Sequence, residues 1–315
     1  MSFALSDEFL AQSTRKRWLL AISGGRDSVA MFHRLIDAGY KKLVLCHVNH
    51  GLRGAESGQD AAFVGRLAKK HDLECAISRV NIRQEAERNN ESIELAARRV
   101  RYDFFAQCAT KYRCPRVLLA HHADDQAETV LFNLLRGSAG LKGMSVQTKR
   151  SVRNQILELW RPMLDTSRHT INNYIAERSI RFREDHSNAQ PIATRNRLRN
   201  EAMPLLAEIM QRDIMTTINR AAAAGKLQQQ ALSEVLADAE LEDPQGRLFL
   251  PKFNTLPAAL RLIALRDFLT KNNISDIDHD LLVRCERVAL HQDTAKTNLP
   301  GNRYFRRKEK RLFIQ

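Results

Sequence analysis

The sequence predicts an α/β fold, with a doubly wound parallel sheet followed by a smaller, mainly helical C-terminal domain. Short apolar segments, bounded by Gly, Pro, Asp or Lys, alternate with helical patterns up to about residue 145. Strands that alternate with helices in this way form parallel βαβ units. Ligands of such sheets bind at the carboxyl ends of the strands. The expected strands are residues 17–22, 42–49, 74–82 and 116–122.

Helices are expected between the strands and through the last third of the chain. Val29, Phe32 and Leu35 fall on one face of the first helix, which Gly39 ends. A long Ala- and Gln-rich helix should be interrupted or bent at Gly225. The other expected helices cover residues 55–71, 91–112, 166–180, the end of 183–210, and 256–273.

The composition favours a large core and a polyanionic partner. The chain has 315 residues, 43% of them hydrophobic, and a formal net charge of +14. Its sequence pI is near 9.9. Basic proteins bind nucleic acid by releasing the counterions of the phosphates. Because the strand–helix alternation weakens after the first half, we expect two domains, residues 1–205 and 206–315.

The C-terminal segment 302–315 combines six basic residues with Tyr304, Phe305 and Phe313. Alternating basic and aromatic residues can hold RNA by pairing with phosphates and stacking on bases. An edge strand with a solvated face explains the same pattern, and the sequence leaves both interpretations open.

The five cysteines are odd in number and no two form a CxxC pair. This pattern argues against a disulfide framework and a zinc site, so we expect buried thiols in a reduced compartment. The N-terminal segment has no signal-peptide pattern. No apolar run reaches the roughly 18 residues of a membrane span. We therefore expect a cytoplasmic protein without membrane contact.

The segment SGGRDS, residues 23–28, follows the first expected strand. Its glycines allow a sharp turn, and the N–H groups and dipole of the following helix favour an anion such as a phosphate. Asp27 beside a phosphate indicates a divalent cation, because Mg²⁺ is commonly held by one or two carboxylates and substrate oxygens. The segment is neither a Walker loop nor a GxGxxG motif.

Ionic residues also follow the second and third strands. His50 and Arg53 lie after the second strand, at the same sheet edge as Ser23, and His50 is either a ligand-binding residue or a hydrogen-bonded turn histidine. Glu94, Arg98 and Arg101 recur at helical spacing. This spacing fits a salt-bridge ladder as well as a substrate-binding face.

Two histidines and three acids gather in segment 120–144, where the fourth strand passes into a helix. Asp124 or Asp125 can cap that helix, and Asp125 and Glu128 share a helix face. Capping explains one aspartate. An acidic cluster beside a phosphate site is better explained by a cationic substrate together with Mg²⁺.

Segment 183–200 is polar and then strongly basic. Arginines two residues apart do not share a helix face, so they must have different partners. Phosphate contact and a solvated basic run are both open. The residues concerned are Asp185, Ser187, Asn188, Arg195, Arg197 and Arg199.

SGGRDS after a first strand resembles the PP-loop of the N-type ATP pyrophosphatases. The resemblance implies an adenine nucleotide alpha hydrolase-like fold that cleaves ATP between its α- and β-phosphates. The blocks SGGRDS, VNHGLRG, SIELAARRVRYDFF, AHHADDQAET with LLRGSAGLKGM, and EDHSN with RNRLRN together resemble the tRNA(Ile)-lysidine synthetase family. They cover about two thirds of the chain. The last third resembles the family's first C-terminal domain less strongly, and longer members carry a further domain.

Members of that family modify the wobble cytidine of a tRNA(Ile) with a CAU anticodon. ATP adenylates the 2-oxygen of the base, and the ε-amine of free L-lysine then displaces AMP to give lysidine. The resemblance implies ATP and Mg²⁺ as cofactors, and this tRNA and lysine as partners. Asn49 stands where some relatives have Asp, so a metal at that position would bind less well.

The resemblance also implies roles for individual residues. We expect Asp125 to be the general base, Arg101 to offset charge, and Asp27 to hold Mg²⁺. Asp125 and Glu128 are expected to bind lysine. The expected ATP-binding residues are Ser23, Gly24, Gly25, Arg26, Asp27, Ser28 and His50. The expected tRNA-binding residues are Arg195, Arg197, Arg199, Arg306, Arg307 and Lys308.

Three other functions compete with this one. A tRNA thiolase of the same superfamily would generally need paired cysteines. A non-catalytic RNA-binding protein is expected to have lost Asp27 or the glycines. A small-molecule amide or amidine ligase does not account for the net charge of +14. The oligomeric state is open, a homodimer being one option.

Overall fold

The structure, a computed structural model, describes residues 3–52, 55–138, 140–183 and 194–315. The chain divides into two compact units. The first consists of Met1–Thr129 and Gly143–Thr216, and the second of Val130–Lys142 and Thr217–Gln315. The domain boundary that we expect near residue 205 stays a prediction.

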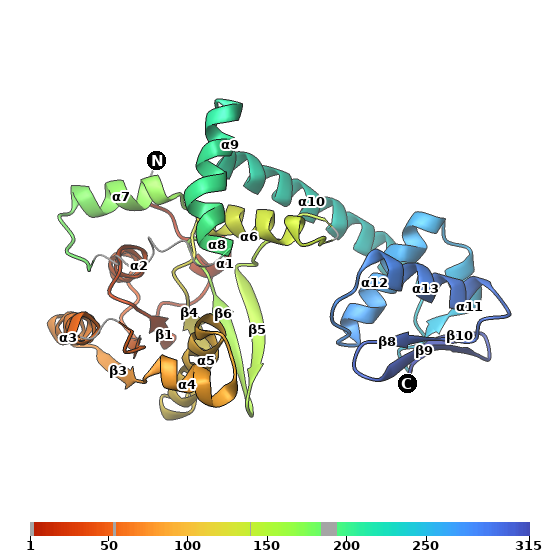
Figure 1. Cartoon of the computed structure of the whole chain (residues 1–315), viewed down its shortest axis with the longest axis horizontal. Coiled ribbons are helices and arrows are strands. Elements are labelled where there is room, and N and C mark those ends of the chain that lie inside the picture. The colour runs from red at the N-terminus through yellow and green to blue at the C-terminus, as the bar shows by residue number, and fades with distance from the viewer. Residues whose placement is uncertain (1–2, 53–54, 139, 184–193) are drawn as a thin grey trace. The chain divides into compact units, whose positions relative to one another are not determined.

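The first unit is built on a six-stranded sheet in the order β3-β2-β1-β4-β6-β5 (Figure 1). Five strands are parallel, and β5 is antiparallel to β6. β1 lies between β2 and β4, so the strand order reverses beside it. Ligands of α/β sheets bind at such a switch point. The bounds are β1 Trp18–Ala21, β2 Leu43–Asn49, β3 Glu74–Arg79, β4 Arg116–Leu118, β5 Gln147–Val152 and β6 Gln155–Trp160.

The mostly parallel sheet and its four expected strands are confirmed, but β5 and β6 were not expected. β5 reads QTKRSV and lies at the edge of the sheet. Edge strands commonly carry charged and polar side chains. A search for apolar segments therefore passes over this hairpin.

Helices cover both faces of this sheet, as predicted. Leu20 of β1 packs in one core with Phe32 and Ile171, whereas Leu19 packs in another with Phe105. Neighbouring residues of a strand point to opposite faces, so the two cores lie on opposite sides of the sheet. The helices that begin in this unit are α1 Asp7–Leu10, α2 Arg26–Asp37, α3 Ala55–Lys70, α4 Ile82–Asn89, α5 Ile93–Lys111, α6 Ala123–Leu135, α7 Arg168–Glu177, α8 Thr194–Arg197, α9 Met203–Met210 and α10 Ile214–Asp238.

The ends of several helices follow the sequence. α2 ends at Asp37, and Gly39 has a φ of +84° beyond it, as expected. A π-helical turn, Leu198–Ala202, joins α8 to α9. Such turns often occur at functional sites. α10 runs without a break through Gly225, so an interruption there was wrong, and the alternative of a bend stays a prediction.

The second unit packs helices against one face of a four-stranded antiparallel sheet of order β7-β10-β9-β8 (Figure 1). Phe253, Leu265 and Phe305 belong to its core. This sheet was not expected in a mainly helical domain, and segment 302–315 forms its two central strands rather than an edge strand. The bounds are α11 Leu250–Asn254, α12 Ala258–Lys271, α13 His279–Leu290, β7 Leu248–Phe249, β8 Lys296–Leu299, β9 Arg303–Lys308 and β10 Arg311–Ile314.

None of the helices in the described part of the chain combines the length and the apolar character needed to cross a membrane. The cysteines are all free thiols, as expected. Cys75 is half-buried, and the four buried ones are Cys46, Cys108, Cys114 and Cys285.

Candidate active site

The turn between β1 and α2 lies at the switch point of the sheet. Gly24 adopts a φ of +93°, a conformation that L side chains rarely adopt, and Gly25 precedes the first residue of α2. A side chain on Gly24 would also contact Phe63 and Arg183. The sequence has glycine here because the backbone requires it.

Two serines stabilise this turn. Ser28 donates a hydrogen bond to the carbonyl of Gly25 at 2.9 Å and accepts one from the N–H of Ser23 at 3.2 Å. Ser23 Oγ accepts from the N–H of Gly25 at 3.1 Å. Among the described residues, none accepts a hydrogen bond from the N–H groups of residues 26–28. These N–H groups begin a helix of 12 residues, so they can receive an anion.

Arg26, an expected ATP ligand, has a partner within the protein. Its guanidinium donates to Asn172 Oδ1 of α7 at 3.0 Å and lies over the Phe182 ring at 5.1 Å from the centroid. A nucleotide could be contacted through the other N–H groups of this guanidinium, or by replacing these partners.

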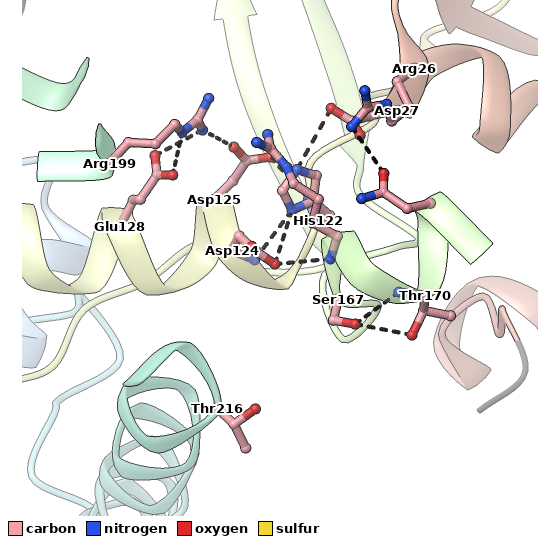
Figure 2. A network of polar contacts seen from close by, with 12 residues as sticks. Arg26, Asp27, His122, Asp124, Asp125, Glu128, Ser167, Thr170, Arg199 and Thr216 are labelled. Atoms are coloured by element: carbon pink, nitrogen blue, oxygen red, sulfur yellow. Dashed lines mark hydrogen bonds and ion pairs between the residues drawn. The ribbon is translucent and has the colours of Figure 1, made fainter. Parts of the chain in front are cut away.

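Asp27 points from the first turn of α2 toward His122 (Figure 2). Its Oδ2 lies 3.7 Å from His122 Nε2, and its buried Oδ1 has no hydrogen-bond partner among the described residues. Burial works to raise the pKa of Asp27, but contact with His122 and the charges of Arg168 and Arg26 outweigh it and lower that pKa. Asp27 is therefore an ionised carboxylate with one free oxygen.

His122 lies among three carboxylates and is fully buried. Its Nε2 is 3.5 Å from Asp125 Oδ2, and its Nδ1 is 3.7 Å from Asp124 Oδ1. Burial opposes protonation, but these carboxylates and Asp27 raise the pKa of His122 to about 9. The carboxylates therefore favour the imidazolium form, whereas the 3.2 Å contact from the Asp124 N–H to Nδ1 suits the neutral ring. His122 is not among the site residues that the sequence predicts.

Asp124 and Asp125 stabilise local structure as well. Asp124 accepts a hydrogen bond from the N–H of Arg168, the first residue of α7, at 3.0 Å. Asp125 Oδ2 accepts from the N–H of His122 at 3.1 Å. Burial works to raise the pKa of Asp124, but His122 and Arg168 lower it. Helix capping thus explains the position of one oxygen of each carboxylate. It does not explain why three carboxylates, those of Asp27, Asp124 and Asp125, lie around His122.

Arg199 already pairs with both expected lysine ligands (Figure 2). Its Nη2 donates to Asp125 Oδ1 at 2.6 Å and to Glu128 Oε2 at 2.9 Å, while its Nε donates to Glu128 Oε1. Glu128 is buried, with 3% of its surface exposed. Burial raises the pKa of Glu128 despite the opposing charge of Arg199. The acidic pair of Asp125 and Glu128 is therefore already paired with a cation of the protein itself, Arg199, which we call the internal cation.

The three neighbouring arginines have different partners, as their spacing predicts. Arg195 donates to Thr129 Oγ1 at 2.6 Å, so it faces α6 as Arg199 does. Arg197 pairs instead with Glu201 at 3.0 Å, and both side chains are exposed.

A second group of polar residues lies around Arg101. Burial, followed by the charge of Arg101, lowers the pKa of His50 to about 4. Burial likewise lowers the pKa of His121 to about 4. Arg101 is exposed, yet protein surrounds it closely enough for desolvation to lower its pKa. His50 Nδ1 and His121 Nδ1 are buried and have no hydrogen-bond partners within the described residues, so each has room for a bound water, ion or ligand as its partner.

A family model described as a PP-loop domain matches residues 4–206. The chain belongs to the PP-loop domain family. The turn at residues 23–28 that follows β1, whose sequence resembles the PP-loop, lies within the matched residues.

Named relatives match beyond the PP-loop domain. A tRNA(Ile)-lysidine synthase from Thermus thermophilus is 33% identical over 320 aligned positions, which cover 99% of this chain and 59% of that protein. One from Solibacter usitatus is 32% identical over 295 residues, covering 90% of this chain and 64% of that protein. The chain thus spans about three fifths of the length of these curated relatives.

Among solved structures, the U34-tRNA thiolase NcsA from Methanococcus maripaludis with its 4Fe-4S cluster is similar. It has a TM-score of 0.53 and 16% sequence identity, and the match covers 70% of this chain and 75% of that one. At this identity the likeness concerns the fold alone.

The carboxylate of Asp27 fits the needs of a magnesium ion. Within the described residues, no three His, Cys, Asp or Glu side chains are grouped to hold a metal ion. Mg²⁺ usually takes one or two carboxylates plus waters and substrate phosphates. The free Oδ1 of Asp27 meets that requirement. Asn49, at the end of β2, uses its Oδ1 to accept from the N–H of Gly51 at 2.9 Å.

The remaining expected residues lie elsewhere. In the second unit, Arg306 and Lys308 point to one face of the sheet, and Arg307 to the other, where it donates to the Ala289 carbonyl at 3.4 Å. Four of the residues singled out in the sequence lie outside the described part of the chain: Arg53, Asp185, Ser187 and Asn188.

Proposed function

We propose that the chain ligates lysine to the 2-position of the wobble cytidine of a tRNA(Ile) with a CAU anticodon, forming lysidine. ATP would adenylate the 2-oxygen with release of pyrophosphate, and lysine would then displace AMP. The observation that carries this proposal is the acidic cluster of Asp27, Asp124, Asp125 and Glu128, which gathers beside the PP-loop. Relatives named tRNA(Ile)-lysidine synthase support it.

In the first step, negative charge develops on the departing pyrophosphate. The N–H groups at residues 26–28 and the dipole of α2 would stabilise that charge. Mg²⁺ bound to Asp27 would add Lewis-acid stabilisation of the phosphates. Arg101 would offset charge on a phosphate or on the base, because it is a cation with access to solvent.

The second step needs a neutral amine. Lysine with a pKa near 10.4 is only about 0.04% neutral at pH 7, which corresponds to a cost of about 4.6 kcal/mol. A carboxylate that binds the ammonium can also accept its proton as the C–N bond forms. We assign that role to Asp125.

The internal cation sets a condition on lysine binding. Glu128 shares both of its oxygens with Arg199. A substrate ammonium that reaches Glu128 must therefore share it with Arg199 or displace that guanidinium. Asp125 presents its Oδ2 on the other side, toward His122.

The tRNA would contact basic residues of both units. Arg197 is an exposed candidate in the first unit, and Arg306 and Lys308 are candidates in the second. Free lysine, ATP and tRNA are all cytoplasmic substrates.

The test is incubation with ATP, Mg²⁺, radiolabelled lysine and a CAU-anticodon tRNA(Ile) transcript. We expect the lysine label in the tRNA, and lysidine in the nucleoside digest. AMP and pyrophosphate should be released in equal amounts. Omission of any substrate should prevent labelling. A tRNA that gains sulfur from a supplied donor, and no lysine, would instead identify a thiolase.

A further inference from the structure

The sheet of the second unit has one face that its helices leave uncovered. Leu248, Leu299, Phe305 and Leu312 are buried in the core against the helices. Side chains alternate between the faces of a strand, so the neighbours of these residues point to the opposite face. We call it the open face, formed by Phe249, Lys296, Asn298, Tyr304, Arg306, Lys308, Arg311 and Phe313.

The open face is basic and aromatic. Lys296 lies over the ring of Tyr304 at 5.2 Å, and Arg311 lies over the ring of Phe249 at 4.4 Å. Both pairs join neighbouring strands, which supports their assignment to one face. Tyr304 is 41% exposed, more than is usual for an aromatic residue in a core.

Few carboxylates neutralise this face. Arg311 pairs with Asp243 at 2.9 Å, and Lys308 pairs with Glu309 through two strongly exposed side chains. Among the described residues, neither Lys296 nor Arg306 forms an ion pair; Arg306 donates to the neutral side chain of Gln315.

The remaining basic residues of β9 point the other way. Arg303 donates to the Asn272 carbonyl at 2.7 Å, and Arg307 to the Ala289 carbonyl at 3.4 Å. These carbonyls lie at the ends of α12 and α13. The sequence grouped Arg306, Arg307 and Lys308, but their side chains divide between the two faces.

We propose that the open face binds an RNA strand, with Lys296, Arg306 and Lys308 pairing with phosphates and Tyr304 stacking on an unpaired base. Phosphates need cations, and every base offers a flat surface for an aromatic ring. An acidic protein would match the charge but would not need the exposed ring. This inference rests on the proposed function only in naming tRNA as the source of the RNA.

The first experiment compares charge-matched double variants of the full chain. Arg306→Ala with Lys308→Ala removes two cations from the open face. Arg284→Ala with Arg287→Ala removes two cations from α13. We expect the first pair to weaken binding of the tRNA transcript and to reduce the slope of log affinity against log salt by about 1.5. Equal losses in both pairs would overturn the proposal, because they would reflect net charge alone.

The second experiment tests stacking. Tyr304→Ala should weaken binding of the transcript at least about fivefold and leave heparin binding unchanged, while Tyr304→Phe should bind like the parent. Unfolding temperatures confirm that each variant folds. Unchanged RNA binding by Tyr304→Ala would overturn the stacking contact.

The outcomes separate this inference from the proposed function. If the open-face variants lose RNA affinity but the parent chain forms no lysidine, the RNA-binding face stands and the proposed reaction falls. If lysidine forms and the variants bind tRNA normally, the reaction stands and the proposed RNA-binding face falls.

Discussion

Asp27 differs from the other acids of its cluster, because one of its carboxylate oxygens is buried and has no hydrogen-bond partner among the described residues. Its negative charge lies at the N-terminus of α2, among groups that would otherwise attract phosphate. A carboxylate in that place is best explained by a cation shared with the substrate.

Asp27→Asn should abolish pyrophosphate release while leaving tRNA binding nearly unchanged. The amide keeps the shape of the side chain but loses the charge that would hold Mg²⁺. Pyrophosphate release and filter binding of tRNA would be measured in parallel, with Asp7→Asn, an exposed acid of α1, as the control. Turnover retained by Asp27→Asn would refute the metal assignment.

Glu128→Gln should raise the lysine KM more than it reduces ATP consumption, and it should also destabilise the protein. The change leaves Arg199 a single carboxylate partner, and breaking a buried ion pair costs about 3–5 kcal/mol. Because 26% of the Arg199 side chain is exposed, we expect a loss of roughly 2–3 kcal/mol in urea unfolding.

The control for Glu128 is Glu201→Gln, which removes the carboxylate from the exposed Arg197 pair. Exposed ion pairs contribute little to stability, so that variant should unfold like the parent. A Glu128 variant that loses lysine use and ATP consumption equally would not support a lysine contact.

At the scale of elements, the PP-loop turn depends on the left-handed conformation of Gly24. Gly24→Ala should cost about 1–2 kcal/mol in stability and should also raise the ATP KM. Gly39→Ala is a matched control, because its φ is +84° and an added Cβ would meet no atom within 4 Å. It should lose similar stability with an unchanged ATP KM. An unchanged KM in both variants would exclude a role for the turn in nucleotide binding.

The elements also show how far sequence could predict the site. The turn, the start of α2 and the acids of α6 are local patterns, so motif and spacing located them. Arg199 and Glu128 are separated by 71 positions, and no spacing rule relates such distant residues. The sequence signal for β5 was equally weak, because the side chains of this polar edge strand carry no apolar period.

His122 shows the same limit of sequence-based prediction within a single motif. The sequence places two neighbouring histidines after β4. Only the packed structure distinguishes them: His122 lies among carboxylates that raise its pKa, whereas burial lowers the pKa of His121.

At the scale of the whole molecule, the two units have separate hydrophobic cores. Separate cores favour separate unfolding transitions, so calorimetry should resolve two. Asp243 is a suitable site for a variant of the second unit, because both of its partners belong to that unit. It accepts hydrogen bonds from Arg247 at 2.8 Å and Arg311 at 2.9 Å. Asp243→Asn should lower one transition, and Glu128→Gln the other. A single transition that both variants lower equally would contradict this division.

The pH dependence provides a further check on Asp243. Burial works to raise its pKa, but Arg247 and Arg311 lower it well below the ordinary value of 3.8. A carboxyl whose pKa is lowered in the folded state stabilises the protein above the unfolded pKa, and this stabilisation is lost as the pH falls through the folded value. The difference between parent and Asp243→Asn should therefore be full at neutral pH and shrink below about pH 4.

The inward arginines of β9 change how the basicity of this chain should be understood. Arg303 and Arg307 donate hydrogen bonds to carbonyls at the C-terminal ends of two helices, so the partial negative charge there offsets part of their positive charge. Titration would still count both. An isoelectric point near 9.9 therefore overstates the attraction that an approaching polyelectrolyte experiences, and electrophoretic mobility will be a poor guide to affinity.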